Sequence, residues 1–81
     1  MDKDDDGRGK IVEQYREIVE VDGDDTLIMS TMLKMIRINE EVSNVNGMFI
    51  DGVINNYEAL LRLDVLLGFM NDISKDVKNR L

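Results

Sequence analysis

Apolar residues recur at intervals of three and four in the first third of the chain, with charged and amide residues between them. Five of them share one side of a helix: Ile11, Val12, Tyr15, Ile18 and Val19. This spacing is that of an amphipathic helix with one face toward a core. We therefore predict a short helix over residues 10–21.

A second periodic segment extends from Thr26 to about Val45 and predicts a second helix. Its apolar residues form one broad stripe, which we expect to face the core: Ile28, Met29, Met32, Leu33, Met35, Ile36 and Val42. The segment 22–25 between the two helices contains Gly23, which can take the left-handed conformation past a helix end, so we expect a tight turn there. Methionines suit either an adaptable binding groove or ordinary core filling, and we favour core filling for those of the stripe.

The chain around residues 44–56 is harder to assign. Residues 44–47 read Asn-Val-Asn-Gly, which favours the end of a helix. In residues 48–56, Asp51-Gly52 between apolar residues is typical of a hairpin turn between two strands. The same residues also fit a helix or a helix-breaking turn. We favour this second interpretation, because an isolated hairpin in a helical chain of this size would bury little.

The last segment gives the clearest helical pattern and predicts a helix over about residues 53–79. Apolar residues alternate by three and four on a wide face: Leu60, Leu63, Leu66, Leu67, Met70, Ile73, Val77 and Leu81. Glu58 with Arg62, and Asp76 with Arg80, have the acid-first spacing of four that stabilises a helix. The fold class we predict is an all-α bundle of three or four helices with a long C-terminal helix, occupying residues 10–81 as one domain after an acidic, flexible lead of residues 1–9.

The predicted third helix is longer than its neighbours, and this favours self-association. At 1.5 Å per residue it spans about 40 Å, against about 30 Å for the second helix. Part of its apolar face would then lack a partner within the chain, and a second copy could cover it in a homodimer or larger assembly. The alternative is a monomer in which the helix bends at Gly68. The expected interface consists of Leu63, Leu66, Leu67, Phe69, Met70, Ile73 and Val77.

Charge and composition narrow the partners. The chain has 81 residues, 17 acids, 10 bases and a net charge of -7, which disfavours direct binding to nucleic acid and favours a basic protein surface. No apolar run is long enough to span a membrane, and the acidic start does not resemble a signal peptide. The absence of Cys makes a reducing compartment, the cytoplasm of a cell or an infected host, the simplest expectation. A single Ala and the absence of Pro are typical of AT-rich coding, as in viruses, phages and low-GC bacteria.

Catalytic chemistry is not expected. The chain contains no His and no Cys, and Ser30, Ser43 and Ser74 have no candidate base arranged around them as in a catalytic triad. We therefore expect a non-enzymatic protein interaction module, such as an adaptor, inhibitor or assembly subunit. An alternative is a small-ligand or nucleotide binder at a subunit interface, with phosphate held by basic residues: Arg8, Lys10, Lys34 or Arg37.

The acidic start also matches a calcium-binding pattern. Asp2, Asp4 and Asp6, followed by Gly7 and by Glu13, occupy the first, third, fifth, sixth and twelfth places of a twelve-residue calcium loop. Residues 2–13 therefore resemble an EF-hand loop. The resemblance implies calcium bound by the side chains of these four acids and the carbonyl oxygen of Arg8. The alternative for the same residues is the acidic flexible lead.

Overall fold

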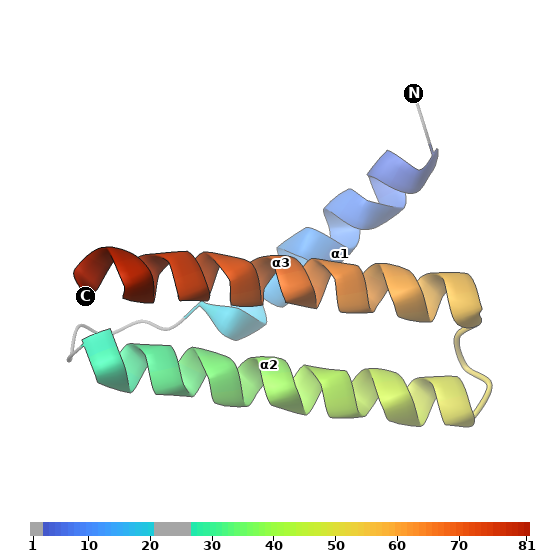
Figure 1. Cartoon of the computed structure of the whole chain (residues 1–81). Helices are drawn as coiled ribbons and strands as arrows, with labels where there is room; N and C mark the ends of the chain where they lie inside the picture. The colour runs from blue at the N-terminus through green and yellow to red at the C-terminus, as the bar shows by residue number, and fades with distance from the viewer. Residues whose placement is uncertain (1–2, 21–26) are drawn as a thin grey trace.

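The protein is an all-α bundle of three helices in a computed structural model that describes residues 3–20 and 27–81, with residues 3–6 and 27 described by backbone alone. The helices are α1 (Lys3–Val19), α2 (Leu27–Ile50) and α3 (Asn56–Arg80). α2 and α3 lie side by side and antiparallel, and α1 crosses one side of this hairpin (Figure 1). The predicted fold class is confirmed, and the predicted turn at residues 22–25 lies outside the described residues.

The predicted apolar face of α1 is confirmed. Ile11, Tyr15 and Val19 are buried, and Tyr15 has no exposed surface at all. Val12 and Ile18 are partly buried and pack against the same core. These side chains fill the space between α2 and α3 on one side of the hairpin. The other buried residues of the core come from the hairpin and its turn: Ile38, Val45, Ile54, Ala59, Val65 and Leu66.

The predicted apolar stripe of α2 does not face this core, and the prediction was wrong. Six of its residues lie in the first half of the helix and are exposed, Met29 by 56 % and Ile36 by 57 %. The residues of α2 that are buried in the core are Ile38 and Val45, two turns apart. Ser30, Lys34 and Arg37 share the other side of this half of the helix and are only partly exposed, so the apolar stripe is the side that the single chain leaves uncovered. The three methionines predicted to fill the core, at positions 29, 32 and 35, are among these exposed residues.

α2 continues through the Asn-Val-Asn-Gly segment, where we predicted its end. Val45 and Met48 pack into the core from this part of the helix, and their burial outweighs the weak helix preference of Asn and Gly. The helix ends in a turn at residues 51–55 instead. Gly52 there has a φ of 77°, a left-handed conformation, and Val53 N–H donates to the Met48 carbonyl at 2.9 Å. Residues 48–56 are thus the end of a helix and a helix-breaking turn, not a hairpin of strands.

α3 begins three residues later than predicted and ends one residue later, because Asn55 caps it. The side-chain oxygen of Asn55 accepts a hydrogen bond from Glu58 N–H at 2.8 Å, as an N-cap residue does. The helix then runs without a break through Gly68, where the alternative prediction placed a bend. Both predicted ion pairs on α3 are present, at 3.0 Å for Glu58–Arg62 and 3.9 Å for Asp76–Arg80.

The predicted difference in length between the last two helices is absent. α2 has 24 residues and α3 has 25, so α3 does not extend far beyond its neighbour. The predicted overhang followed from ending the second helix too early. α1 also begins earlier than predicted, at Lys3, so residues 3–9 belong to a helix rather than to a flexible lead.

Candidate interaction face

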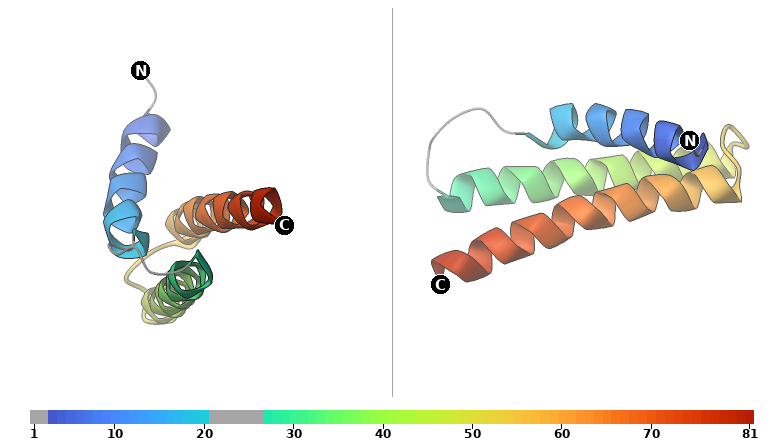
Figure 2. Two further views of the ribbon diagram at one scale, coloured as in Figure 1. Left: turned by 90° about the vertical axis from the view of Figure 1, so that its left-hand side faces the viewer. Right: turned by 90° about the horizontal axis from the view of Figure 1, so that it is seen from above.

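The side of the hairpin opposite α1 has no described helix over it (Figure 2). An apolar groove, formed by a row of pockets, follows this side between α2 and α3. Near the turn, the groove opens into a pocket of about 690 Å³. Smaller pockets continue it past Met35 and Met70 toward Leu81. The described residues that line the pocket of 690 Å³ carry no charge: Asn39, Val42, Ser43, Val45, Asn46, Phe49, Asn56, Ala59, Leu60 and Leu63.

α3 presents a regular seam to this groove. From Leu60 onward the residues on the seam alternate by three and four to the end of the chain, and all but one are apolar. Leu60 is 66 % exposed and Leu67 is 64 % exposed, although their spacing is that of a helix–helix contact. The α3 seam consists of Leu60, Leu63, Leu67, Met70, Ser74, Val77 and Leu81.

α2 presents a second seam with the same alternation of four and three. Its apolar members are exposed as well, from 38 % for Val42 to 66 % for Ile28. Two asparagines interrupt it in the second half of the helix. The α2 seam consists of Ile28, Met32, Met35, Asn39, Val42, Asn46 and Phe49. Two seams of this kind, side by side, are half of the core of a four-helix bundle.

The predicted interface on α3 is only partly located at the groove. Leu63, Met70 and Val77 line its pockets, and Leu67 lies on the same seam. Leu66 is 1 % exposed and belongs to the core of the single chain, which corrects its assignment to an interface. Phe69 and Ile73 are partly buried against that core, and Ile73 also lines a pocket of the groove. The contribution of α2 to the groove was missed, although the alternating positions of its seam could have indicated it.

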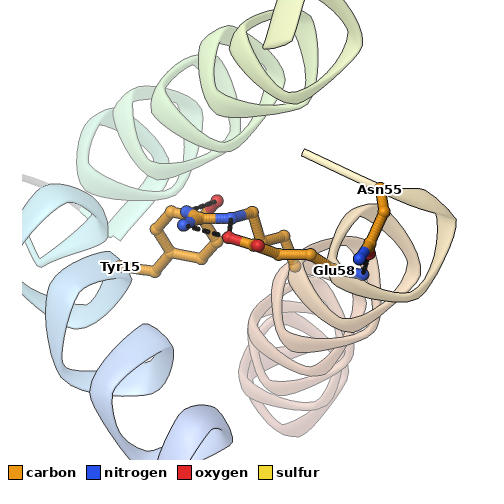
Figure 3. A network of polar contacts seen from close by, with 4 residues as sticks. Tyr15, Asn55 and Glu58 are labelled. Carbon is orange, nitrogen blue, oxygen red and sulfur yellow. Dashed lines mark hydrogen bonds and ion pairs between the residues drawn. The ribbon is translucent and has the colours of Figure 1, made fainter. Parts of the chain in front are cut away.

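Polar contacts join the helices on the α1 side (Figure 3). The buried Tyr15 hydroxyl accepts a hydrogen bond from Arg62 Nη1 at 3.2 Å, and the guanidinium carbon lies 6.0 Å from the centre of the Tyr15 ring. Arg62 also donates to Glu58 Oε2 from Nη2 at 3.0 Å. Asn55 caps the same turn of α3 through Glu58 N–H. This network fixes α1 against the start of α3. It also gives the hydroxyl of the fully buried Tyr15 a hydrogen-bond partner.

The charge of Arg62 is retained in this network. Burial disfavours the charged guanidinium, but the hydrogen bonds with Tyr15 and Glu58 outweigh that effect and raise the pKa of Arg62 above its ordinary value. A raised pKa contributes stability that is complete below the unfolded pKa and is lost only as the pH rises through the folded pKa. Because both values lie far above neutrality, Arg62 adds no pH dependence to stability near pH 7.

The basic residues proposed to bind phosphate do not converge. Arg8 forms an ion pair with Asp64, and Arg37 donates to the carbonyl oxygens of Ile18 and Glu20 at 3.2 Å each. Arg37 thereby binds the open C-terminal end of α1, where a positive charge is favourable. Lys34 lines a different pocket, which also contains acidic side chains, and Lys10 is exposed on α1. A small-ligand or nucleotide site built from these residues stays a prediction.

The predicted calcium ligands are only partly described. Asp2 and the side chains of Asp4 and Asp6 lie outside the described residues. Arg8 and Glu13 are located on α1, and Glu13 pairs with Arg16 at 3.3 Å. A calcium loop turns its backbone around the ion, whereas residues 3–13 follow a helix, so binding would require this part of α1 to unwind. Among the described side chains, no group of three or more acids could hold a metal ion.

Comparison with known protein families, with curated proteins and with solved structures gave no significant match to this chain. Function must therefore be argued from the residues and their arrangement. Within the described residues, no helix has both the length and the apolar character that crossing a lipid bilayer requires.

Proposed function

We propose that the protein is a non-enzymatic interaction module that self-associates through the groove between α2 and α3. Two copies, each contributing its α2–α3 hairpin, form a four-helix bundle with α1 of each copy on the outside. This assembly presents an acidic outer surface, suited to a basic surface of a partner protein.

The observation that carries this proposal is the pair of exposed seams. Seven positions on each helix alternate by three and four, as in helices that pack against one another, yet Leu60, Leu67 and Ile28 are each at least 64 % exposed. Exposed apolar side chains at this spacing are typical of a helix–helix contact, and the single chain supplies no partner helix for it within the described residues.

A second copy fits this groove better than a charged partner does. The described residues that line its largest pocket are apolar or uncharged, so they offer no charge for a basic or acidic side chain to meet. The groove also follows helices of 24 and 25 residues, and a second hairpin of the same length can lie along them. In the described residues the core of one chain has only nine buried hydrophobic residues, a small number for a stable domain.

The solution mass of the purified chain, measured by light scattering across a range of concentrations, tests this proposal. We expect a dimer. Leu67→Glu places a carboxylate in the groove and should raise the dissociation constant by about a hundredfold or more, because each dimer loses two buried leucines. Far-UV circular dichroism should show unchanged helix content, since Leu67 lies outside the core.

Asn79→Glu is the matched control, because it adds the same charge to an exposed position of α3 outside the seam. We expect this variant to remain dimeric. A wild-type chain that is monomeric at all concentrations, or a dimer that Leu67→Glu leaves intact, would contradict the proposal.

A further inference from the structure

We propose that the two copies pack with their α2 helices antiparallel, and that Asn39 and Asn46 set this orientation by pairing across a two-fold axis. The inference rests on the self-association proposed above and specifies its geometry. The axis crosses α2 between Val42 and Ser43, which both line the pocket of 690 Å³. Residues equally far from this point on either side then lie opposite each other in the two copies.

The asparagines are the first reason for this register. Asn39 and Asn46 are the polar members of the α2 seam, and both are exposed and line the pocket of 690 Å³. They lie at equal distances from the proposed axis, so Asn39 of one copy meets Asn46 of the second copy. Each amide can both donate and accept, so the two form a hydrogen-bonded pair, twice in each dimer. An unpaired amide in an apolar interface is costly, which makes other registers unfavourable.

Two exposed apolar clusters of α2 are the second reason. Met35 and Ile36, before the centre, are 46 % and 57 % exposed; Phe49 and Ile50, at the end of the helix, are 44 % and 71 % exposed. The proposed axis places Met35 opposite Ile50 of the second copy and Ile36 opposite Phe49. Each exposed cluster on α2 therefore covers the other. A parallel arrangement would instead place each apolar cluster beside the same cluster of the second copy. Each asparagine would likewise lie beside the same asparagine of the second copy.

The third reason comes from α3, which was not used to choose the axis. Leu63 lines the same pocket as Val42, so the axis passes α3 close to Leu63. It then places Leu63 near Leu63 of the second copy, and Leu60 near Leu67 of the second copy. The same axis thus brings apolar residues of α2 against α2 of the second copy, and apolar residues of α3 against α3 of the second copy.

Single cysteines test the orientation, because the chain contains no native cysteine. Ser43→Cys lies beside the axis, so two copies should form a disulfide readily on oxidation. Met35→Cys alone should form little, whereas an equal mixture of Met35→Cys and Ile50→Cys chains should form mixed dimers. Glu17→Cys, exposed on α1, is the control for random collision. Non-reducing electrophoresis and mass spectrometry identify the products.

Each outcome decides between arrangements. Efficient disulfide formation by Met35→Cys alone would show parallel packing and overturn the inference. Chains that are dimeric by light scattering but form no disulfide through Ser43→Cys would also overturn it, while leaving self-association established. A monomer by light scattering refutes the proposed function itself.

Substitution of the asparagines tests their role in orientation. Asn39→Leu leaves Asn46 of the second copy without its partner and should weaken the dimer about tenfold. Asn39→Leu with Asn46→Leu should recover or exceed the original affinity but lose the single orientation, so Met35→Cys added to this background should now form disulfides with itself. An affinity loss in the double variant that equals the sum of the single losses, with no new disulfide, would show that the asparagines do not pair.

Discussion

The two sides of the α2–α3 hairpin have nearly the same hydrophobicity and opposite exposure. On the side that faces α1, Ile38, Val45 and Leu66 are at most 2 % exposed. On the other side, Leu60 and Leu67 of the same helix as Leu66 are exposed by about two thirds of their surface. The sequence places leucines on both sides, but only one side is covered within the chain. The difference shows that residue type predicts which faces are apolar. Tertiary packing decides which of these faces is buried within the chain.

The largest effect should come from the covered side. Leu66→Ala removes a leucine that is 1 % exposed and leaves a cavity at the centre of the core, so the free energy of unfolding should fall by about 2–5 kcal/mol. Urea denaturation followed by circular dichroism measures it. A loss below about 1 kcal/mol would mean that the side of the hairpin facing α1 is not the core of the chain, which would contradict the difference between the two sides.

An intermediate effect is expected from the polar network on the same side. Arg62→Met removes the hydrogen bond to the buried Tyr15 hydroxyl, which should cost about 1–3 kcal/mol of stability. Adding Tyr15→Phe removes the orphaned hydroxyl, so the double variant should lose less than the sum of the two single variants. Additive losses in the same urea experiment would indicate that the pair is not coupled.

The smallest effect is expected on the exposed side, and it should depend on protein concentration. Leu60→Ala makes the same chemical change as Leu66→Ala but on a side chain that is 66 % exposed. At high dilution its unfolding free energy should lie within about 0.5 kcal/mol of the original. At high concentration, where dimers form, the loss should grow, because dimerisation adds stability by mass action. A concentration-independent loss would assign Leu60 to the core of one chain.

The sequence predicted the helices and the inner face of α1, where polar residues lie opposite the buried Ile11, Tyr15 and Val19. On α3 it predicted one wide apolar face, of which Leu66 is buried whereas Leu60 and Leu67 are exposed. It failed for α2, where the apolar stripe within residues 28–36 is exposed, because an apolar pattern does not indicate whether a face packs inside the chain. It also failed at Asn44–Gly47, because weak local helix preference was outweighed by the packing of Val45 and Met48. The groove itself depends on where α1 lies, and that position follows from contacts distant in sequence, such as Arg62 with Tyr15.

The short turn at residues 51–55 has a consequence for the order in which the chain folds. It joins α2 and α3 so closely in sequence that the hairpin can form after closure of a small loop, whereas docking of α1 must bring Tyr15 to Arg62 across 47 positions. We therefore expect the hairpin to form in the transition state and α1 to dock afterwards. Stopped-flow kinetics should then show Val45→Ala slowing folding, and Tyr15→Phe mainly accelerating unfolding. During this interval, a nascent chain would expose both sides of its hairpin, so α1 and a second copy would compete for the same two helices.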